Sequence, residues 1–256
     1  MKCILVPALL LLWAGPAWSD PFTMNVAWSE CLAKGGTQNM SFSCDTDAGS
    51  EVLIVSFSVG EPVPWLAAIE TRIDVSSAPL CGGVPCAGPD LPSWWQLEAG
   101  GCRAGHGAFS MDFSGPPYAQ GAACMAPWLL DKGSGGMITS YPSSYYGSPS
   151  VASIQMVGTV FVSAPRVALV PGQEYYAFRL TIDNVRTVAP GSCADCCAPV
   201  YLIPSFLKID QPLGAPGGDY VATVSPFTAL WQAGGGPCGP TAARRPTWGR
   251  IKSQYR

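Results

Sequence analysis

The sequence predicts an all-β protein. We expect an antiparallel β-sandwich that is cross-linked by disulfides, and a jelly roll is one arrangement that it could adopt. Three observations lead to this prediction. Strand-like alternation recurs along the chain between turn residues. Only 12% of the residues are charged, while glycine (29) and proline (25) are abundant, a composition that disfavours long helices. Cysteines are numerous, and their number is even once an expected leader is removed.

That leader has the pattern of a secretory signal peptide. Lys2 precedes an apolar run, Cys3–Gly15, that is too short to span a bilayer. Ala17 and Ser19 are small residues at the positions that a signal peptidase inspects, so we expect cleavage before Asp20. The mature protein is therefore expected to be secreted or periplasmic.

The other end of the chain is basic. Residues 244–256 carry five basic residues and no acidic one, whereas residues 20–243 hold eight basic and seventeen acidic residues. Such a tail could dock on the acidic body, touch an anionic surface or act as an export or sorting address. The predicted organisation is a signal peptide (1–19), a single disulfide-rich β-sandwich domain (20–243) and a basic tail (244–256), without a transmembrane segment.

Two segments show the strand period of two most clearly. In residues 65–76 one side of the strand carries Ile69, Thr71, Ile73 and Val75. In residues 173–183 one side carries Tyr176, Phe178, Leu180 and Ile182. Further strands are expected at 52–59, 151–162, 200–209, 219–224 and 227–231.

Three irregular features accompany these strands. Pro204 within one of them indicates an edge position or a bulge, because proline donates no ladder hydrogen bond. Residues 79–92 are expected to form a loop. Residues 131–150, rich in Gly, Ser and Tyr, are expected to form a linker or a long surface loop.

The cysteines are expected to form disulfides, because an exported chain matures in an oxidising compartment. A zinc cluster is disfavoured, since His106 is the only histidine, and the turn Cys193-Ala-Asp-Cys196-Cys197 lacks the helix that a redox-active CxxC requires. Adjacent cysteines are too close to bridge each other. The predicted pairs are Cys31 with Cys44, Cys81 with Cys86, Cys102 with Cys124, Cys193 with Cys196, and Cys197 with Cys238.

No catalytic signature stands out. Asp45, Asp47 and Glu51 resemble the opening of a calcium loop, but the closing ligand of an EF-hand is missing, so an Asx-rich turn is the favoured interpretation. His106 has no serine-elbow partner. Glu70 and Asp74 could flank a glycosidic bond, although a surface role beside Arg72 is the commoner arrangement.

Aromatic residues suggest a binding surface instead. Trp94, Trp95, Tyr141, Tyr145 and Tyr146 lie in or beside expected loops, where flat rings could stack on sugars. Because neighbouring strand residues face opposite ways, one of the two tryptophans is expected in the core and the other exposed or covered by a loop.

Several short motifs carry a resemblance. WWQ followed by GGCR, the strand EYYAFRLTIDN, the CADCC turn and the ending WGRIKSQYR together resemble a group of exported bacterial proteins with a cysteine-rich β-sandwich. The resemblance spans most of the mature chain. It implies a bacterial exported protein, and it implies no catalytic residue, because no activity is assigned to that group.

We therefore expect a secreted, non-enzymatic structural or adhesion module. The alternative is a carbohydrate-binding module that uses exposed aromatics, and a secreted glycoside hydrolase is a more remote one. The expected partner is a cell-surface glycan or protein. No nucleic acid, cofactor or metal is expected.

Overall fold

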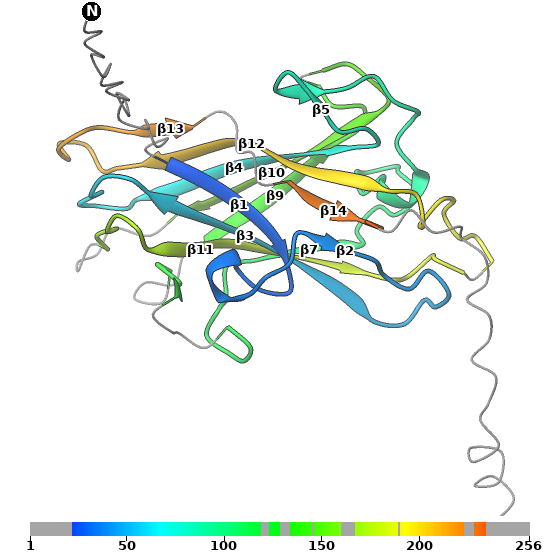
Figure 1. Cartoon of the computed structure of the whole chain (residues 1–256), viewed down its shortest axis with the longest axis horizontal. Helices are drawn as coiled ribbons and strands as arrows, with labels where there is room; N and C mark the ends of the chain where they lie inside the picture. Colours follow the sequence, from blue (N-terminus) through cyan, green and yellow to red (C-terminus); the bar gives the residue numbers. More distant parts are fainter. Residues whose placement is uncertain are drawn as a thin grey trace, which may run out of the picture.

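The computed structural model describes residues 22–118, 123–128, 134–144, 146–159, 167–188, 190–222 and 228–233. Two β-sheets pack face to face as a sandwich, which confirms the predicted fold class (Figure 1). The expected signal peptide, basic tail and Cys238 lie outside the described residues. Within them, no helix is long and apolar enough to cross a bilayer.

The smaller sheet has the strand order β1-β3-β11-β7, and the short strand β8 runs parallel to β11. All its other pairings are antiparallel. Its strands are β1 (Phe22–Trp28), β3 (Ser50–Val59), β7 (Gly107–Ser110), β8 (Cys124–Met125) and β11 (Glu174–Asp183).

The larger sheet has the order β2-β14-β12-β4-β10-β9, with β13 also paired to β12. Only β2 and β14 run parallel to each other in it. Its strands are β2 (Asn39–Met40), β4 (Ala68–Ser76), β9 (Ser134–Ser140), β10 (Val151–Thr159), β12 (Val200–Asp210), β13 (Tyr220–Ala222) and β14 (Ala229–Trp231). All seven segments expected to be strands contain one.

Short elements complete the described chain. A two-stranded hairpin follows β4 and stands out from the sandwich in Figure 1. Two 3₁₀ turns are the only helical elements among the described residues. These elements are β5 (Leu80–Cys81), β6 (Val84–Pro85), η1 (Leu32–Lys34) and η2 (Ser93–Trp95).

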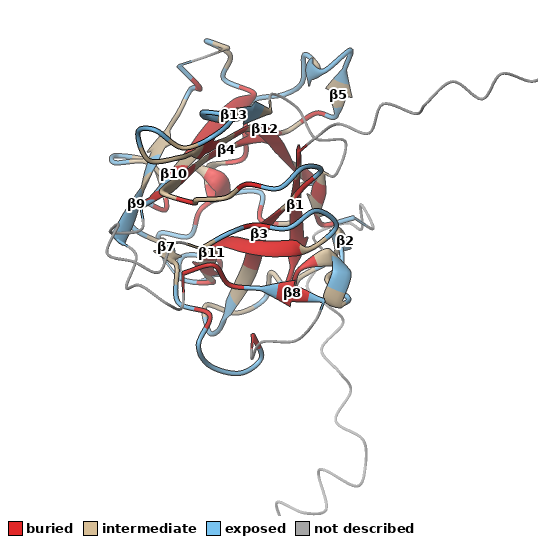
Figure 2. Ribbon diagram, turned by 90° about the vertical axis from the view of Figure 1, so that its left-hand side faces the viewer, coloured by how far each residue is buried: buried red, intermediate tan, exposed pale blue. Residues whose placement is uncertain are grey.

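The core lies between the sheets, where buried residues are concentrated in Figure 2. The predicted inner face of β4 is confirmed, because Ile69, Thr71, Ile73 and Val75 are all buried. In β11 the alternation holds from Phe178 onward, but a bulge shifts the register between Tyr176 and Phe178. Tyr175 to Phe178 are consequently all buried, contrary to a simple two-residue period.

The prediction of a linker or surface loop at 131–150 was wrong for residues 134–140. These form β9, which pairs with seven consecutive residues of β10. Glycines and serines have low strand propensity, so their strand conformation depends on the neighbouring strand rather than on local sequence. Residues 141–144 and 146–150 connect β9 to β10.

Candidate functional site

The two adjacent tryptophans do not form a surface platform. Trp94 and Trp95 are both buried, in a cluster of rings with Trp231. Trp94 Nε1 donates to Thr187 Oγ1 over 3.0 Å. The expectation that one of the pair would be exposed or merely covered by a loop was wrong, because η2 is a 3₁₀ turn and not a strand, so its residues do not alternate between faces.

The three tyrosines predicted to bind a ligand do not share one location. Tyr141 is partly buried and packs against the core. Tyr145 lies outside the described residues. Tyr146 is partly buried, and its hydroxyl donates to Asp74 Oδ2 over 3.1 Å. Of the four predicted binding aromatics that the structure describes, Tyr146 is the one that lines the pocket described below.

Four disulfides join described residues, and only one predicted pair, Cys81–Cys86, is confirmed. The pairs Cys31–Cys44, Cys102–Cys124 and Cys193–Cys196 were wrong, because the sheets bring distant loops together. Cys197 is also disulfide-bonded, and its predicted partner lies outside the described residues. The three long bridges are Cys31–Cys124, Cys44–Cys196 and Cys102–Cys193.

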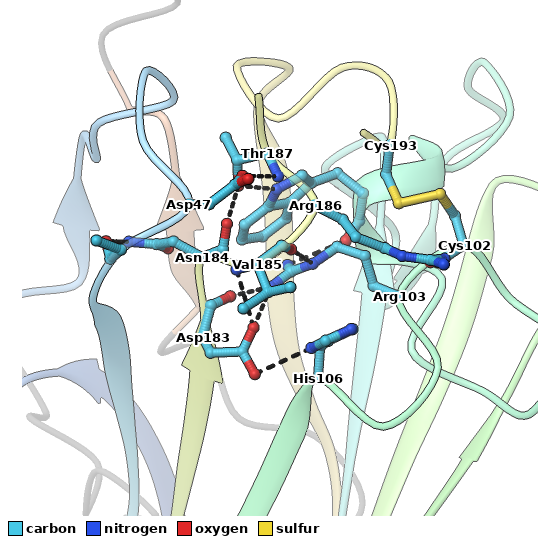
Figure 3. A network of polar contacts seen from close by, with 12 residues as sticks. Asp47, Cys102, Arg103, His106, Asp183, Asn184, Val185, Arg186, Thr187 and Cys193 are labelled. Atoms are coloured by element: carbon cyan, nitrogen blue, oxygen red, sulfur yellow. Dashed lines mark hydrogen bonds and ion pairs between the residues drawn. A yellow bond between two sulfur atoms is a disulfide. The ribbon is translucent and has the colours of Figure 1, made fainter. Parts of the chain in front are cut away.

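A buried arginine organises the loops beside one of these bridges (Figure 3). Arg103 is fully buried, lies 3.7 Å above the ring of Trp94 and donates to the backbone carbonyls of Trp94, Val185 and Asp183. Burial lowers the pKa of Arg103 to about 10, and the Asp183 carboxylate opposes the shift. The guanidinium therefore stays charged at neutral pH and holds the loop after β11 in place.

Two residues considered for chemistry belong to the same network. His106 Nδ1 lies 3.1 Å from Asp183 Oδ2 (Figure 3). Asp47 Oδ1 accepts hydrogen bonds from the backbone amides of Thr187 and Val188, at 2.7 and 2.8 Å. Asp47 thus anchors the loop after β11, through hydrogen bonds to distant backbone amides and not through those of a local Asx turn.

The described residues form a pocket on the outer face of the larger sheet. Its volume is about 400 Å³, within the range of roughly 300–1,000 Å³ that small-molecule sites have. Strands β4 and β12 form its floor, while the β5–β6 hairpin and the β9–β10 connection form its walls. It is lined by Arg72, Asp74, Leu80, Gly83, Val84, Tyr146, Ile203, Pro204, Ser205 and Phe206.

The alternation of side chains along the strands determines which polar residues lie in the floor of the pocket. Because the inner face of β4 buries its odd-numbered residues, Arg72 and Asp74 face outward. In β12 a register shift between Pro204 and Phe206 leaves Ser205 in a bulge. The sequence prediction of a bulge or an edge at Pro204 is confirmed as a bulge, since β12 is an interior strand.

Asp74 is the most unusual group in the pocket. Its side chain is fully buried, and its Oδ1 has no hydrogen-bond partner. Arg72 Nε lies 3.5 Å from this oxygen and donates to Ser205 Oγ at 2.9 Å. Burial raises the pKa of the Asp74 carboxyl. Hydrogen bonding by the hydroxyls of Ser205 and Tyr146 and the positive charge of Arg72 act in the opposite direction and lower it.

The paired carboxylates Glu70 and Asp74 have different partners. They lie four positions apart on one strand, so their Cα atoms are separated by about 13 Å. Glu70 Oε1 accepts a 2.6 Å hydrogen bond from Gln155 Nε2, whereas Asp74 Oδ2 accepts one from the Tyr146 hydroxyl. This geometry assigns Glu70 to the sheet surface.

One further group of potential ligand atoms lies in the smaller sheet. Cys31, Cys124 and Glu174 place one such atom each within 4.8 Å of the others. The two sulfurs are joined in a disulfide, and the Glu174 carboxylate accepts hydrogen bonds from Asn25, Ser56 and the backbone amide of Ala33. These donors already satisfy the carboxylate, so the group is a structural one.

Comparison of the chain with protein-family models, curated proteins and solved structures gave no match. The resemblance to exported bacterial proteins therefore stays a prediction. Among the pocket residues, Ser205 and Phe206 were missed by sequence reasoning. Pro204 within a strand was the available signal, because a bulge often marks a place where a sheet re-aims a side chain.

Proposed function

We propose that this protein is an exported, non-enzymatic binding module that holds a chemical group of an extracellular partner in the pocket on the outer face of the larger sheet. One observation carries the proposal: Asp74 lines a cavity that can admit a ligand, and its fully buried carboxylate has an oxygen, Oδ1, that accepts no hydrogen bond and lies 3.5 Å from Arg72 Nε. Buried polar atoms are normally satisfied, so such an exception calls for an explanation.

Two features support a binding role over an enzymatic one. Glu70 accepts a hydrogen bond from Gln155 and does not line the pocket with Asp74. His106 is engaged with Asp183 in the loop-anchoring network rather than with a nucleophile. Four disulfides among the described residues support export, because such bonds persist in oxidising compartments.

Fragment binding to the mature chain tests the proposal. Amide NMR signals would be followed while neutral, cationic and anionic polar fragments are added. We expect at least one class to shift the signals of Arg72, Asp74 and Ser205 in a saturable manner. Binding that leaves these three signals unmoved would contradict the proposed site.

Two matched tryptophan substitutions serve as controls. Val84→Trp places a large ring on the pocket wall, and Val221→Trp places the same ring on β13, outside the pocket lining. The two valines are similarly exposed, at 49% and 54%. We expect Val84→Trp to abolish the shifts and Val221→Trp to preserve them. Equal binding by both variants would overturn the proposal.

A further inference from the structure

We infer that the group held in this pocket is a neutral sugar ring, an inference that rests on the proposed function. The charge, the hydrogen-bonding capacity and the apolar lining of the pocket support this assignment. The buried tryptophans Trp94 and Trp95 are not part of that lining.

Charge in the pocket favours a neutral ligand. Arg72 and Asp74 both line it, and Arg72 Nε lies 3.5 Å from Asp74 Oδ1. A cationic ligand that approached Asp74 would also face the guanidinium of Arg72. An anionic ligand would face the carboxylate. Opposite charges so close together cancel most of the attraction for either kind of ion.

Hydrogen bonding requires a donor on the ligand. Asp74 Oδ2 already accepts from the Tyr146 hydroxyl, whereas Oδ1 accepts no hydrogen bond and is buried 3.5 Å from Arg72 Nε. A ligand hydroxyl reaches Oδ1 when the neighbouring side chains of the floor shift, and it then supplies the missing donor without adding charge. A hydrogen bond to a charged acceptor is stronger than one between neutral groups. A polyhydroxylated ligand therefore fits the floor of the pocket.

Apolar side chains line much of the pocket. Leu80 and Val84 come from the hairpin wall, and Pro204 and Phe206 from the β12 part of the floor. A sugar ring combines hydroxyl groups at its edge with apolar C–H faces, so its edge can meet Asp74 while a face packs against these side chains. The volume of about 400 Å³ provides room for such a ring.

Three probes built on the same ring test the inference. They are a neutral methyl hexopyranoside, a hexosamine that carries an ammonium group, and a hexuronic acid that carries a carboxylate. Each is titrated into the full mature chain, and the amide signals of Arg72, Asp74 and Ser205 are followed. The neutral probe is tested as several methyl hexopyranosides that differ in hydroxyl configuration. We expect saturable binding of at least one of them, about tenfold tighter than that of its charged analogues.

Variants link the binding to the proposed contacts. Asp74→Asn removes the charged acceptor, and Phe206→Ala removes the aromatic ring from the β12 part of the pocket floor. We expect each to weaken the neutral glycoside about tenfold, while Val221→Ala on the same sheet leaves it unchanged. Near-ultraviolet circular dichroism confirms that each variant folds.

The outcomes separate the two proposals. If a charged probe or a non-sugar fragment binds the pocket more tightly than every neutral glycoside, the sugar assignment is wrong and the proposed function stands. Sugar binding that survives both Asp74→Asn and Phe206→Ala also overturns the assignment. If no probe of any class reaches the pocket, both proposals fail.

Discussion

Arg103 and Asp74 are both fully buried charged residues, but their surroundings differ. Arg103 donates to three backbone carbonyls and stacks on Trp94. Asp74 has one oxygen that accepts no hydrogen bond. A buried charge is stable only when its partners satisfy it, so Arg103 has the properties of a structural residue. Asp74 lacks such satisfaction at Oδ1, which is why the proposed function assigns it to ligand binding.

Arg103→Met should destabilise the protein strongly. The change leaves the carbonyls of Trp94, Val185 and Asp183 without their donor, and each orphaned buried group costs about 1–3 kcal/mol. We expect the free energy of unfolding, measured by urea denaturation, to fall by at least about 2 kcal/mol. Lys208→Met, which removes two ion pairs at the surface, is the control and should change the free energy of unfolding little. Equal effects of the two substitutions would refute the anchoring role.

Asp74→Asn should alter how stability depends on pH. Burial raises the pKa of Asp74 in the folded protein, so the folded state holds this proton more tightly than the unfolded state. The free energy of unfolding therefore falls as pH rises from the ordinary aspartate value through the raised one. We expect Asp74→Asn to be more stable than the wild type at pH 7, with a difference that shrinks toward pH 3.5. The measurement is urea denaturation of the wild type and Asp74→Asn at a series of pH values, and a difference that does not depend on pH would contradict the expectation.

At the scale of elements, the pocket depends on two local irregularities. The bulge at Ser205 in β12 changes which side chains face outward, so that both Ile203 and Phe206 line the pocket. The β5–β6 hairpin adds a wall, and the Cys81–Cys86 bridge closes it. The floor belongs to the sheet, whereas the wall belongs to an exposed two-stranded element that is marginal by itself.

The double substitution Cys81→Ser and Cys86→Ser should loosen the wall without unfolding the sandwich. The bridge spans only five positions, so its loss should cost about 2 kcal/mol in the chain-entropy model. We expect faster amide hydrogen exchange at residues 80–86, unchanged exchange in β4 and β12, and weaker fragment binding. Unchanged exchange in the hairpin would show that the bridge does not hold the wall.

At the scale of the whole molecule, long disulfides connect loops that are distant in sequence. Cys44–Cys196 and Cys102–Cys193 join the loops around the buried tryptophans, and Trp231 Nε1 donates to the carbonyl of Cys196. Arg103 lies next to Cys102 and fastens the same region. The covalent links and the densest aromatic packing thus support one end of the sandwich.

The double substitution Cys44→Ser and Cys196→Ser should be far more damaging than loss of the hairpin bridge. This bridge spans 152 positions, and closing a loop of that length is worth about 5 kcal/mol in the chain-entropy model. That is comparable with the whole stability of many domains, about 5–15 kcal/mol. Urea denaturation of the two double variants compares the losses directly. A loss no larger than that of the hairpin variant would contradict the chain-entropy account.

Local patterns in the sequence determined the fold class and seven of the fourteen described strands, because side-chain alternation and turn residues act over a few positions. They also anticipated the bulge at Pro204 and the short Cys81–Cys86 bridge. The strand β9 was not predictable in this way, because its glycines and serines adopt strand geometry through pairing with β10.

Only the tertiary structure decided which distant residues meet. The long disulfides, the burial of both Trp94 and Trp95, and the convergence of Arg72, Tyr146 and Ser205 on Asp74 depend on how loops pack across two sheets. The sequence shows Asp74 as an outward-facing strand residue, which suggests exposure. It is buried because a neighbouring hairpin and loop cover that end of the sheet. The two-residue alternation of a single strand cannot reveal that other segments cover its outer face.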